Sequence, residues 1–377
     1  MPWPEVSTMS LRYEFVMLAR QAGANIAARC RRFGVSRKTG YKWLARFVRD
    51  GAAGLGDRSR RPRRSPAQTP AAIEAAVIAL RKRQPAWGGR KLTRRLVTLG
   101  HQDVPAPSTV TAILHRHRLI DPAESAKHTA CVRFEHAAPN DLRQMDFKGW
   151  FTLPTGRCHP LTVLDDHSRF NLLLRACANE QSGTVQTAMT DVFRRYGLPA
   201  RMSMDNGALW GSDAAHGLTP LTVWLIRLGI AVSHSRPYHP QTQGKDERVH
   251  RTLDIELLQR RVFRDLVQVQ RHFDRFRDLY NLERPHEALG LPVPASRYQP
   301  SERTFPERLP PIEYSPEDTV RRVQAKGELS YRGRTFRISK ALRGYAVALR
   351  PLAQDGRFAV FFCHQQVAEL DLHHPRG

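Results

Sequence analysis

Three acidic residues have the type and the setting that metal-dependent chemistry at phosphorus requires. Asp146 lies inside a segment that favours a β-strand, Asp205 follows a short strand-like run, and Glu247 lies near the start of a long predicted helix. The three residues are separated by 59 and 42 positions. A strand centre and a neighbouring strand end would hold two of them rigidly, and a packed helix would bring the third across.

Carboxylates at these places would suit a divalent metal ion. Mg²⁺ prefers hard oxygen ligands and is usually held by few carboxylates together with substrate phosphate oxygens and water. Two such ions about 3.5–4 Å apart activate an attacking oxygen and stabilise the leaving oxygen in an in-line displacement at phosphorus. Three carboxylates in one place repel one another unless a cation neutralises them.

Each acid also has an ordinary structural explanation. Asp205 and the Asn-Gly that follows it are a common turn signal, and an acid near a helix start is favoured by the helix dipole. Asp146 is harder to explain in this way, because an acid inside a strand has low propensity and needs a partner when it is buried. The adjacent acids Asp165 and Asp166 lie in a predicted hairpin. A turn role is favoured for Asp166, with a supporting role at the metal site as the alternative.

The residues around the acids predict a mixed β-sheet flanked by helices. Three strand-like runs in succession are followed by alternating helices and strands, which is typical of that architecture. The expected strands are 142–151, 161–165, 170–176, 200–204 and 230–234, and the expected helices are 182–196, 218–228 and 243–264. We therefore expect an α/β domain over residues 137–300, and it contains all three acids.

Residues 1–56 predict a helix-turn-helix domain. Apolar residues keep helical spacing over 11–22 and 26–33, and Ser36 is placed as the N-cap of a third, basic helix. The first residues of such a recognition helix enter the major groove of DNA. An ordinary three-helix bundle with a solvated basic face is the alternative. The residues predicted to contact DNA are Arg37, Lys38, Tyr41 and Lys42.

The other segments complete a multidomain chain. Residues 57–68 are a basic linker, 69–136 a second all-α, winged-helix-like DNA-binding domain, and 301–318 a Pro-rich linker. Short alternating strands separated by glycines predict a small β-barrel over 319–377, also with a DNA-binding role. The linker residues predicted to follow DNA phosphates are Arg60, Arg61, Arg63 and Arg64.

Charge and composition favour a nucleic-acid partner. The 377 residues carry a net charge of +25, with a net +11 in residues 1–66 and +8 in residues 320–350. Such an excess concentrates polyanions through counterion release, and a ribosomal-type protein is the plainer alternative. Five cysteines with no Cys-x-x-Cys pair argue against a disulfide framework and a thiolate zinc site. Without a long apolar run, we expect a soluble, cytoplasmic protein and no membrane partner.

Three motifs together resemble a known enzyme family. They are Gln-Met-Asp-Phe at residues 144–147, Asp-Asn-Gly at 205–207, and Arg-Pro-Tyr-His-Pro-Gln-Thr-Gln-Gly-Lys-Asp-Glu-Arg at 236–248. This set is similar to the DDE core of retroviral-type integrases. It most resembles bacterial insertion-sequence transposases of the insertion-sequence 481-like group, which carry the helix-turn-helix and the core in one reading frame. The likeness extends over nearly the whole chain.

The resemblance implies an RNase H-like core in which Asp146, Asp205 and Glu247 bind two Mg²⁺ or Mn²⁺ ions. It implies binding to the terminal inverted repeats of an insertion sequence, nicking that releases 3′-OH ends, and joining of those ends to target DNA. It also implies a homo-oligomer on double-stranded DNA in the bacterial nucleoid. By the same resemblance, the residues beside the catalytic helix that would touch DNA are His239, Gln241, Gln243, Lys245 and Arg248.

Some features depart from the family pattern or leave a choice open. The gap between the second and third acids is slightly longer than in retroviral integrases, and the sequence has no His/Cys zinc module. Asp246 stands beside Glu247, and neighbouring helical residues point about 100° apart, so both cannot face one metal equally. Glu247 is chosen because it matches the family position. A catalytically inactive or domesticated DNA-binding protein, such as a repressor, is the alternative function. A ribonuclease H or junction resolvase would leave the basic N-terminus unexplained.

Overall fold

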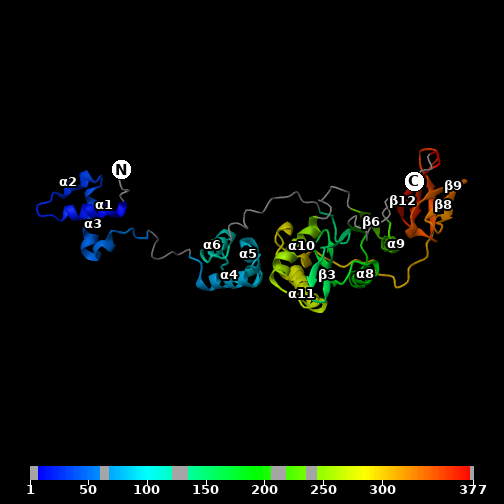
Figure 1. The fold of residues 1–377 in the computed structure, drawn as a ribbon, viewed down its shortest axis with the longest axis horizontal. Helices are drawn as coiled ribbons and strands as arrows, with labels where there is room; N and C mark the ends of the chain where they lie inside the picture. Colours follow the sequence, from blue (N-terminus) through cyan, green and yellow to red (C-terminus); the bar gives the residue numbers. More distant parts are fainter. Residues whose placement is uncertain (1–6, 60–67, 121–134, 205–217, 235–243, 374–377) are drawn as a thin grey trace. The chain divides into compact units, whose positions relative to one another are not determined.

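The computed structural model describes residues 7–59, 68–120, 135–204, 218–234 and 244–373. The chain divides into two compact units, residues 1–68 and 69–377, and each is described by itself (Figure 1). Among the described residues, no helix combines the length and the apolar character needed to cross a membrane.

The N-terminal unit consists of the three predicted helices. It contains α1 (Thr8–Ala19), α2 (Ile26–Arg32) and α3 (Arg37–Asp50), followed by a 3₁₀ turn. The side chain of Ser36 accepts a hydrogen bond from the Thr39 amide, which confirms the predicted N-cap of α3. The buried side chains that join the three helices are Phe15, Val16, Ala19, Cys30, Trp43 and Leu55.

The second unit begins with three helices, α4 (Ala71–Arg83), α5 (Gly89–Thr98) and α6 (Pro107–Arg116). Their apolar faces enclose Trp87, which is almost completely buried. The second group of three helices expected from the sequence is therefore present, within the same compact unit as the central sheet. The described residues 69–120 contain no strand, so a winged element is not seen in them.

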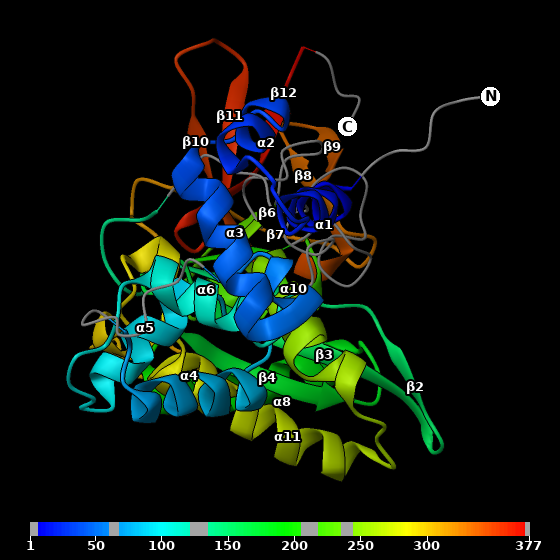
Figure 2. The same cartoon turned by 90° about the vertical axis from the view of Figure 1, so that its left-hand side faces the viewer.

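The central region forms the predicted mixed sheet. Its strands are β1 (Leu142–Phe147), β2 (Phe151–Leu153), β3 (Gly156–Asp165), β4 (Asn171–Cys177), β5 (Arg201–Met204) and β6 (Ala231–His234). The order is β2-β3-β1-β5-β6, with β4 also paired to β3. β1 is antiparallel to β3 and parallel to β5, and β5 is parallel to β6. The one strand expected over 142–151 is instead two, because Gly149 takes a positive φ of 93° between β1 and β2. Figure 2 shows the β2–β3 hairpin extending beyond the rest of the sheet.

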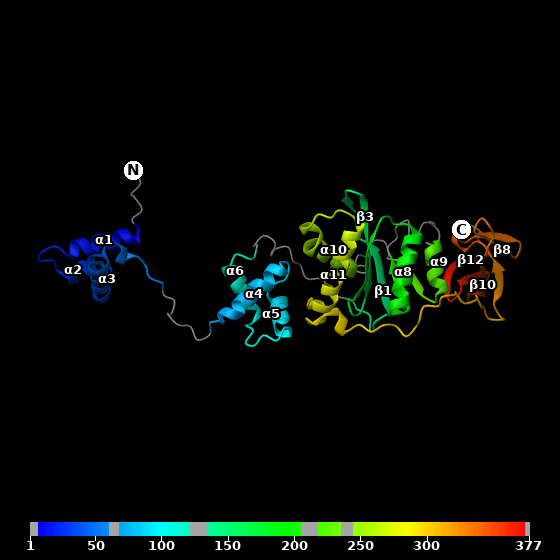
Figure 3. The same cartoon turned by 90° about the horizontal axis from the view of Figure 1, so that it is seen from below.

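Helices cover both faces of this sheet (Figure 3). α8 (Ser182–Tyr196) and α9 (Pro220–Arg227) pack on the face that carries Met145 and Val163. α10 (Gly244–Glu256) and α11 (Leu266–Asp278) pack on the face that carries Leu164. The helix expected over 243–264 ends at Glu256, and α11 was not predicted.

The last part of the chain is a small β domain. β7 (Thr319–Arg322), β10 (Ala346–Pro351), β11 (Arg357–Phe362) and β12 (Gln365–Asp371) form a four-stranded sheet in the order β12-β11-β10-β7. β8 (Glu328–Tyr331) and β9 (Arg334–Arg337) form a separate two-stranded sheet. The predicted barrel is thus confirmed only as a small β domain, whose strands pair as two sheets around one apolar core.

The segment expected to be a linker, 301–318, contains no helix or strand but packs on the core. The backbone amide of Leu198 donates to the carbonyl of Arg303 (2.7 Å), and the ring of Phe305 stacks near that of Phe193. The segment therefore runs along the end of α8 as part of the domain surface.

Candidate active site

Asp146 is the second-to-last residue of β1. This strand lies between the antiparallel strand β3 and the parallel strand β5. Thr162 is the partner of Asp146 on β3, and the Thr162 hydroxyl donates a hydrogen bond to the Asp146 carbonyl (3.1 Å). The same hydroxyl forms a hydrogen bond with His250 Nε2 on α10 at 2.8 Å. β1, β3 and α10 are thereby joined at the level of Asp146.

His250 is a neutral imidazole in this arrangement. Burial, with a smaller contribution from the Lys148 charge, lowers the pKa of His250 to about 4. Its Nδ1 lies 3.9 Å from the carboxylate oxygen Oδ2 of Asp146. His250 thus contacts Thr162 through one ring nitrogen and faces Asp146 with the other.

The first turn of α10 presents two acids to different surroundings. Asp246 is completely buried, and burial followed by the charge of Asp146 raises its pKa well above the ordinary value. Neither carboxylate oxygen of Asp246 makes a hydrogen bond, although the nearby Thr162 hydroxyl partly offsets the rise in the pKa of Asp246. Glu247 is exposed to solvent. The structure therefore brings Asp246 next to Asp146, while Glu247 lies on the open side of the same helical turn.

The third predicted ligand, Asp205, lies outside the described residues, directly after β5. The last residue of β5, Met204, pairs with Met145 of β1. Within the described residues, no group of three or more His, Cys, Asp or Glu side chains is arranged to hold a metal ion. The chemistry of the donors nevertheless fits Mg²⁺ or Mn²⁺, because β1 and α10 supply the carboxylates of Asp146 and Glu247, and the adjacent Asp246 adds two buried oxygens that lack a donor.

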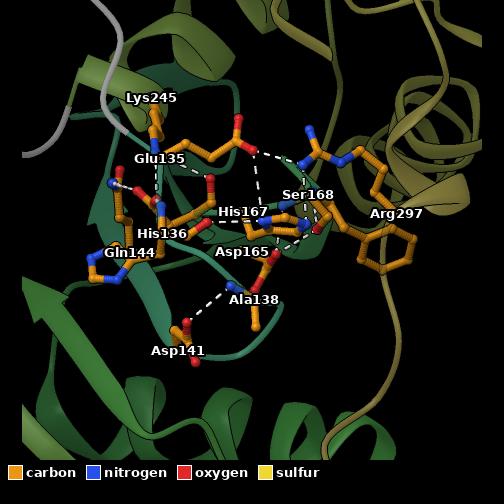
Figure 4. Close-up of polar contacts among 12 residues, drawn as sticks. Glu135, His136, Ala138, Asp141, Gln144, Asp165, His167, Ser168, Lys245 and Arg297 are labelled. Carbon is orange, nitrogen blue, oxygen red and sulfur yellow. Dashed lines mark hydrogen bonds and ion pairs between the residues drawn. The ribbon is translucent and has the colours of Figure 1, made fainter.

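Asp166 is more than a turn residue. Its buried carboxylate accepts from Gln144 Nε2 (2.8 Å) and from the backbone amide of His136 (2.9 Å). It also forms an ion pair with Lys245 Nζ (2.5 Å), and that amine donates to the Asp166 carbonyl as well (3.1 Å). Figure 4 shows Lys245, Gln144 and His136 gathered at this place. Asp165 is the residue that caps the turn, because its carboxylate accepts from the amide and hydroxyl of Ser168 (2.8 and 2.5 Å).

Lys245 was predicted to contact DNA, but its amine has an internal partner. The side chain is 9% exposed and the Asp166 side chain 2% exposed. A phosphate contact by Lys245 is therefore not supported by this placement and stays a prediction. Local sequence did not indicate the pair, because its members are 79 residues apart.

The other predicted DNA contacts are either exposed or outside the described residues. The four on α3 lie in its first two turns and are all exposed, namely Arg37, Lys38, Tyr41 and Lys42. Arg248 on α10 is exposed as well. Tyr41 is 58% exposed, which is unusual for a large aromatic side chain, and Lys42 Nζ lies 4.3 Å from the ring centre of Trp43. The residues outside the described part of the chain are Arg60, Arg61, Arg63, Arg64, His239, Gln241 and Gln243.

Several segments of the chain match known protein families. Residues 11–63 match a helix-turn-helix domain and residues 39–114 a homeodomain-like domain. Residues 136–240 and 228–294 each match an integrase core domain, and residues 318–376 match the C-terminal domain of IS481 family transposases. Together these matches support an IS481-family transposase with an integrase-type core. Its core is of the integrase type, and its domains are those of DNA transposase and integrase enzymes.

The individual proteins that match this chain are distant in sequence. A Gag-Pol polyprotein of avian reticuloendotheliosis virus is 25% identical over 130 residues, which are 34% of this chain and 11% of the polyprotein. Among solved structures, the simian T-cell lymphotropic virus intasome in complex with PP2A regulatory subunit B56 gamma matches at 14% identity and a TM-score of 0.38, covering 78% of this chain and 99% of that one. The HTLV-2 integrase catalytic core in complex with magnesium matches at 13% identity and a TM-score of 0.34, covering 44% and 100%.

Proposed function

We propose that this chain is a transposase that binds the terminal inverted repeats of an insertion sequence, nicks the DNA and joins the ends to target DNA. The observation that carries the proposal is the convergence of Asp146 with the acidic first turn of α10 on one face of the sheet. The exposed basic start of α3 and the IS481-type C-terminal domain support DNA as the substrate.

The proposed metal ligands are Asp146, Asp205 and Glu247, around two Mg²⁺ or Mn²⁺ ions. When bound, such a pair supplies the Lewis acidity for in-line displacement at phosphorus. In the first step, water adds to a phosphodiester and the bond to the 3′ oxygen breaks, which leaves a 3′-OH and a 5′-phosphate. In the second, that 3′-OH attacks a target phosphodiester and a target 3′-OH leaves. Neutral His250 contacts Thr162, whose hydroxyl also contacts the Asp146 carbonyl, and so joins α10 to β3 and β1 beside Asp146.

The decisive experiment is nicking of labelled duplexes taken from the DNA that flanks the coding sequence. The wild-type chain should release 3′-OH ends in Mg²⁺ and release none in EDTA. Asp146→Asn should bind the same duplex and leave it intact. If the wild type binds the duplex in an assembled complex and does not nick it in Mg²⁺ or Mn²⁺, the chain is a DNA-binding protein without catalysis.

DNA binding is assigned to α3, to the basic linker 57–68, and to the C-terminal domain, which we propose closes as a small barrel. Replacing Arg37 and Lys38 together by Ala should weaken binding to the terminal repeat and reduce the dependence of affinity on salt. We propose domain boundaries at 1–56, 69–136, 137–300 and 319–377. We also propose a homo-oligomer that pairs two ends on the nucleoid DNA of a bacterial cell. Light scattering of the assembled complex would contradict the oligomer if it gave one chain per pair of ends.

A further inference from the structure

We propose that the Asp166 carboxylate is a positioning residue that sets the place of α10 on β1. This inference rests on the proposed function, because it concerns how the acids of α10 are held opposite Asp146. Asp166 would act through two neighbours, Gln144 and Lys245, and would not itself touch substrate.

The contacts of Asp166 reach both elements that carry the proposed metal ligands. Its Oδ1 accepts from Gln144 Nε2 at 2.8 Å, and Gln144 is two residues before Asp146 on β1. Its Oδ2 pairs with Lys245 Nζ at 2.5 Å, and Lys245 is two residues before Glu247 on α10. Residues two apart on a strand point to the same face, so Gln144 and Asp146 both face α10. One buried carboxylate therefore connects the strand and the helix on the side where their acids meet.

The position of Lys245 in α10 makes this contact an anchor for the start of the helix. α10 begins at Gly244, so Lys245 is its first residue with a side chain. The amine makes two contacts with one residue, to the carboxylate and to the carbonyl of Asp166, which fix its direction as well as its distance. Within the described residues, two other ion pairs connect α10 with the sheet strands or the loops that follow them. One is the wider contact between His250 and Asp146, and the other is Lys148–Asp254, about two turns further along the helix than Lys245.

The burial of the pair separates positioning from simple stabilisation. A buried ion pair contributes little to the stability of the fold, and often less than two apolar side chains of similar size would. Removing one partner alone is nevertheless strongly destabilising. In some proteins, however, a buried polar or ionic pair selects one register of the two elements it joins. If register is what Asp166 and Lys245 supply, then removing both charges should restore stability without restoring the geometry of the acids.

The test compares Asp166→Asn, Lys245→Met and the double variant in the full-length chain. We would measure the melting temperature, hydrogen exchange of peptides within 244–256 without metal, and Mn²⁺ binding without DNA from the paramagnetic signal of free Mn²⁺. Each single variant should melt lower, exchange faster in α10 and bind Mn²⁺ about tenfold or more weakly, as supporting residues of metal sites do. The double variant should regain the melting temperature and keep the weak Mn²⁺ binding.

Arg175→Met is the matched control, because Arg175 forms an ion pair of 2.8 Å with Asp191 between β4 and α8, away from α10. It should leave Mn²⁺ binding and exchange in α10 unchanged. Recovery of Mn²⁺ affinity together with the melting temperature in the double variant would overturn the proposal, as would unchanged binding in Asp166→Asn. Weaker DNA binding in Lys245→Met alone, with Mn²⁺ binding intact, would assign Lys245 to DNA instead. If the wild type bound no Mn²⁺, the proposed function would fail, and the exchange data would still report on the anchor.

Discussion

Replacing Asp246 by Val should stabilise the core and thereby show that this carboxyl group is retained for a reason other than folding. Asp246 is completely buried on α10, and neither of its oxygens has a hydrogen-bond partner. It also lies near the charge of Asp146, which raises the pKa of Asp246 further. Val has a similar volume and no polar atom, so it removes the unfavourable group without opening a large cavity.

The size of the effect follows from the burial. A buried polar group without a partner costs about 1–3 kcal/mol, and burying an apolar side chain of this size contributes roughly 1.5 kcal/mol or more. After some loss to imperfect packing, Asp246→Val should raise the free energy of local unfolding by about 2–4 kcal/mol. Because about 1.4 kcal/mol is a factor of ten, amide exchange in α10 should slow by about 30-fold or more.

Hydrogen exchange of the full-length chain in EDTA measures this directly, with peptides from β1 and α10. Asp246→Asn is the matched control, because it keeps the shape and an unpaired polar group and should exchange nearly as the wild type does. Faster exchange in Asp246→Val would refute the reasoning, since it would mean that the carboxyl has a favourable partner. Slower exchange combined with weaker Mn²⁺ binding would identify Asp246 as a residue that gives up stability for the metal site.

Three further predictions concern stability. Burial and nearby cations hold the pKa of His286 well below 6.5, so the unfolded chain takes up the proton first as the pH falls. In urea titrations below pH 6.5, the free energy of unfolding should drop by up to about 1.4 kcal/mol per pH unit because of this group. The drop should be less steep in His286→Gln. Arg143→Met should destabilise the chain by about 3 kcal/mol or more in urea, because the buried guanidinium donates to the carbonyls that end α8. Gly40→Val should speed exchange in residues 8–50, because an added Cβ would meet Cys30 Sγ at 2.5 Å and Phe15 Cζ at 2.8 Å. Unchanged exchange there would show that the three helices can separate to admit the side chain.

Sequence patterns identified the elements whose signals are local. The helix predicted over 182–196 is α8 with the same bounds, and the mixed sheet follows from the order of strand-like runs. The predicted end of α10 was wrong, because residues 257–265 contain no Gly or Pro that would mark the end of a helix. The chain turns there because Leu257 and Phe263 are buried against the sheet, with the Phe263 ring 6.0 Å from that of Phe151. That cause lies more than a hundred residues away in the sequence.

The contacts of the site that could not be predicted from the sequence also join residues far apart in the chain. The Asp-Asp-His-Ser run at 165–168 does form a turn, but the carboxylate that caps it belongs to Asp165, whereas the sequence favoured a turn role for Asp166. The partners that give Asp166 its second role are 22 and 79 residues away. No periodicity or turn rule links positions at such distances, and only the packing of α10 on β1 brings them together.

The same packing explains why the choice between Asp246 and Glu247 cannot be made from composition or from the motif alone. Both acids stand in the first turn of α10, where the helix dipole favours either of them, so the local energetics treat them alike. Their roles separate only when the helix has a fixed rotation on the sheet, because a step of about 100° sends one side chain inward and the next to solvent. Lys245, which directly precedes them, fixes that rotation through Asp166. The apolar packing of Val249 and Leu253 also holds α10 on the sheet, but the contact with Asp166 lies next to both acids, so a change at Asp166 should disturb the two together.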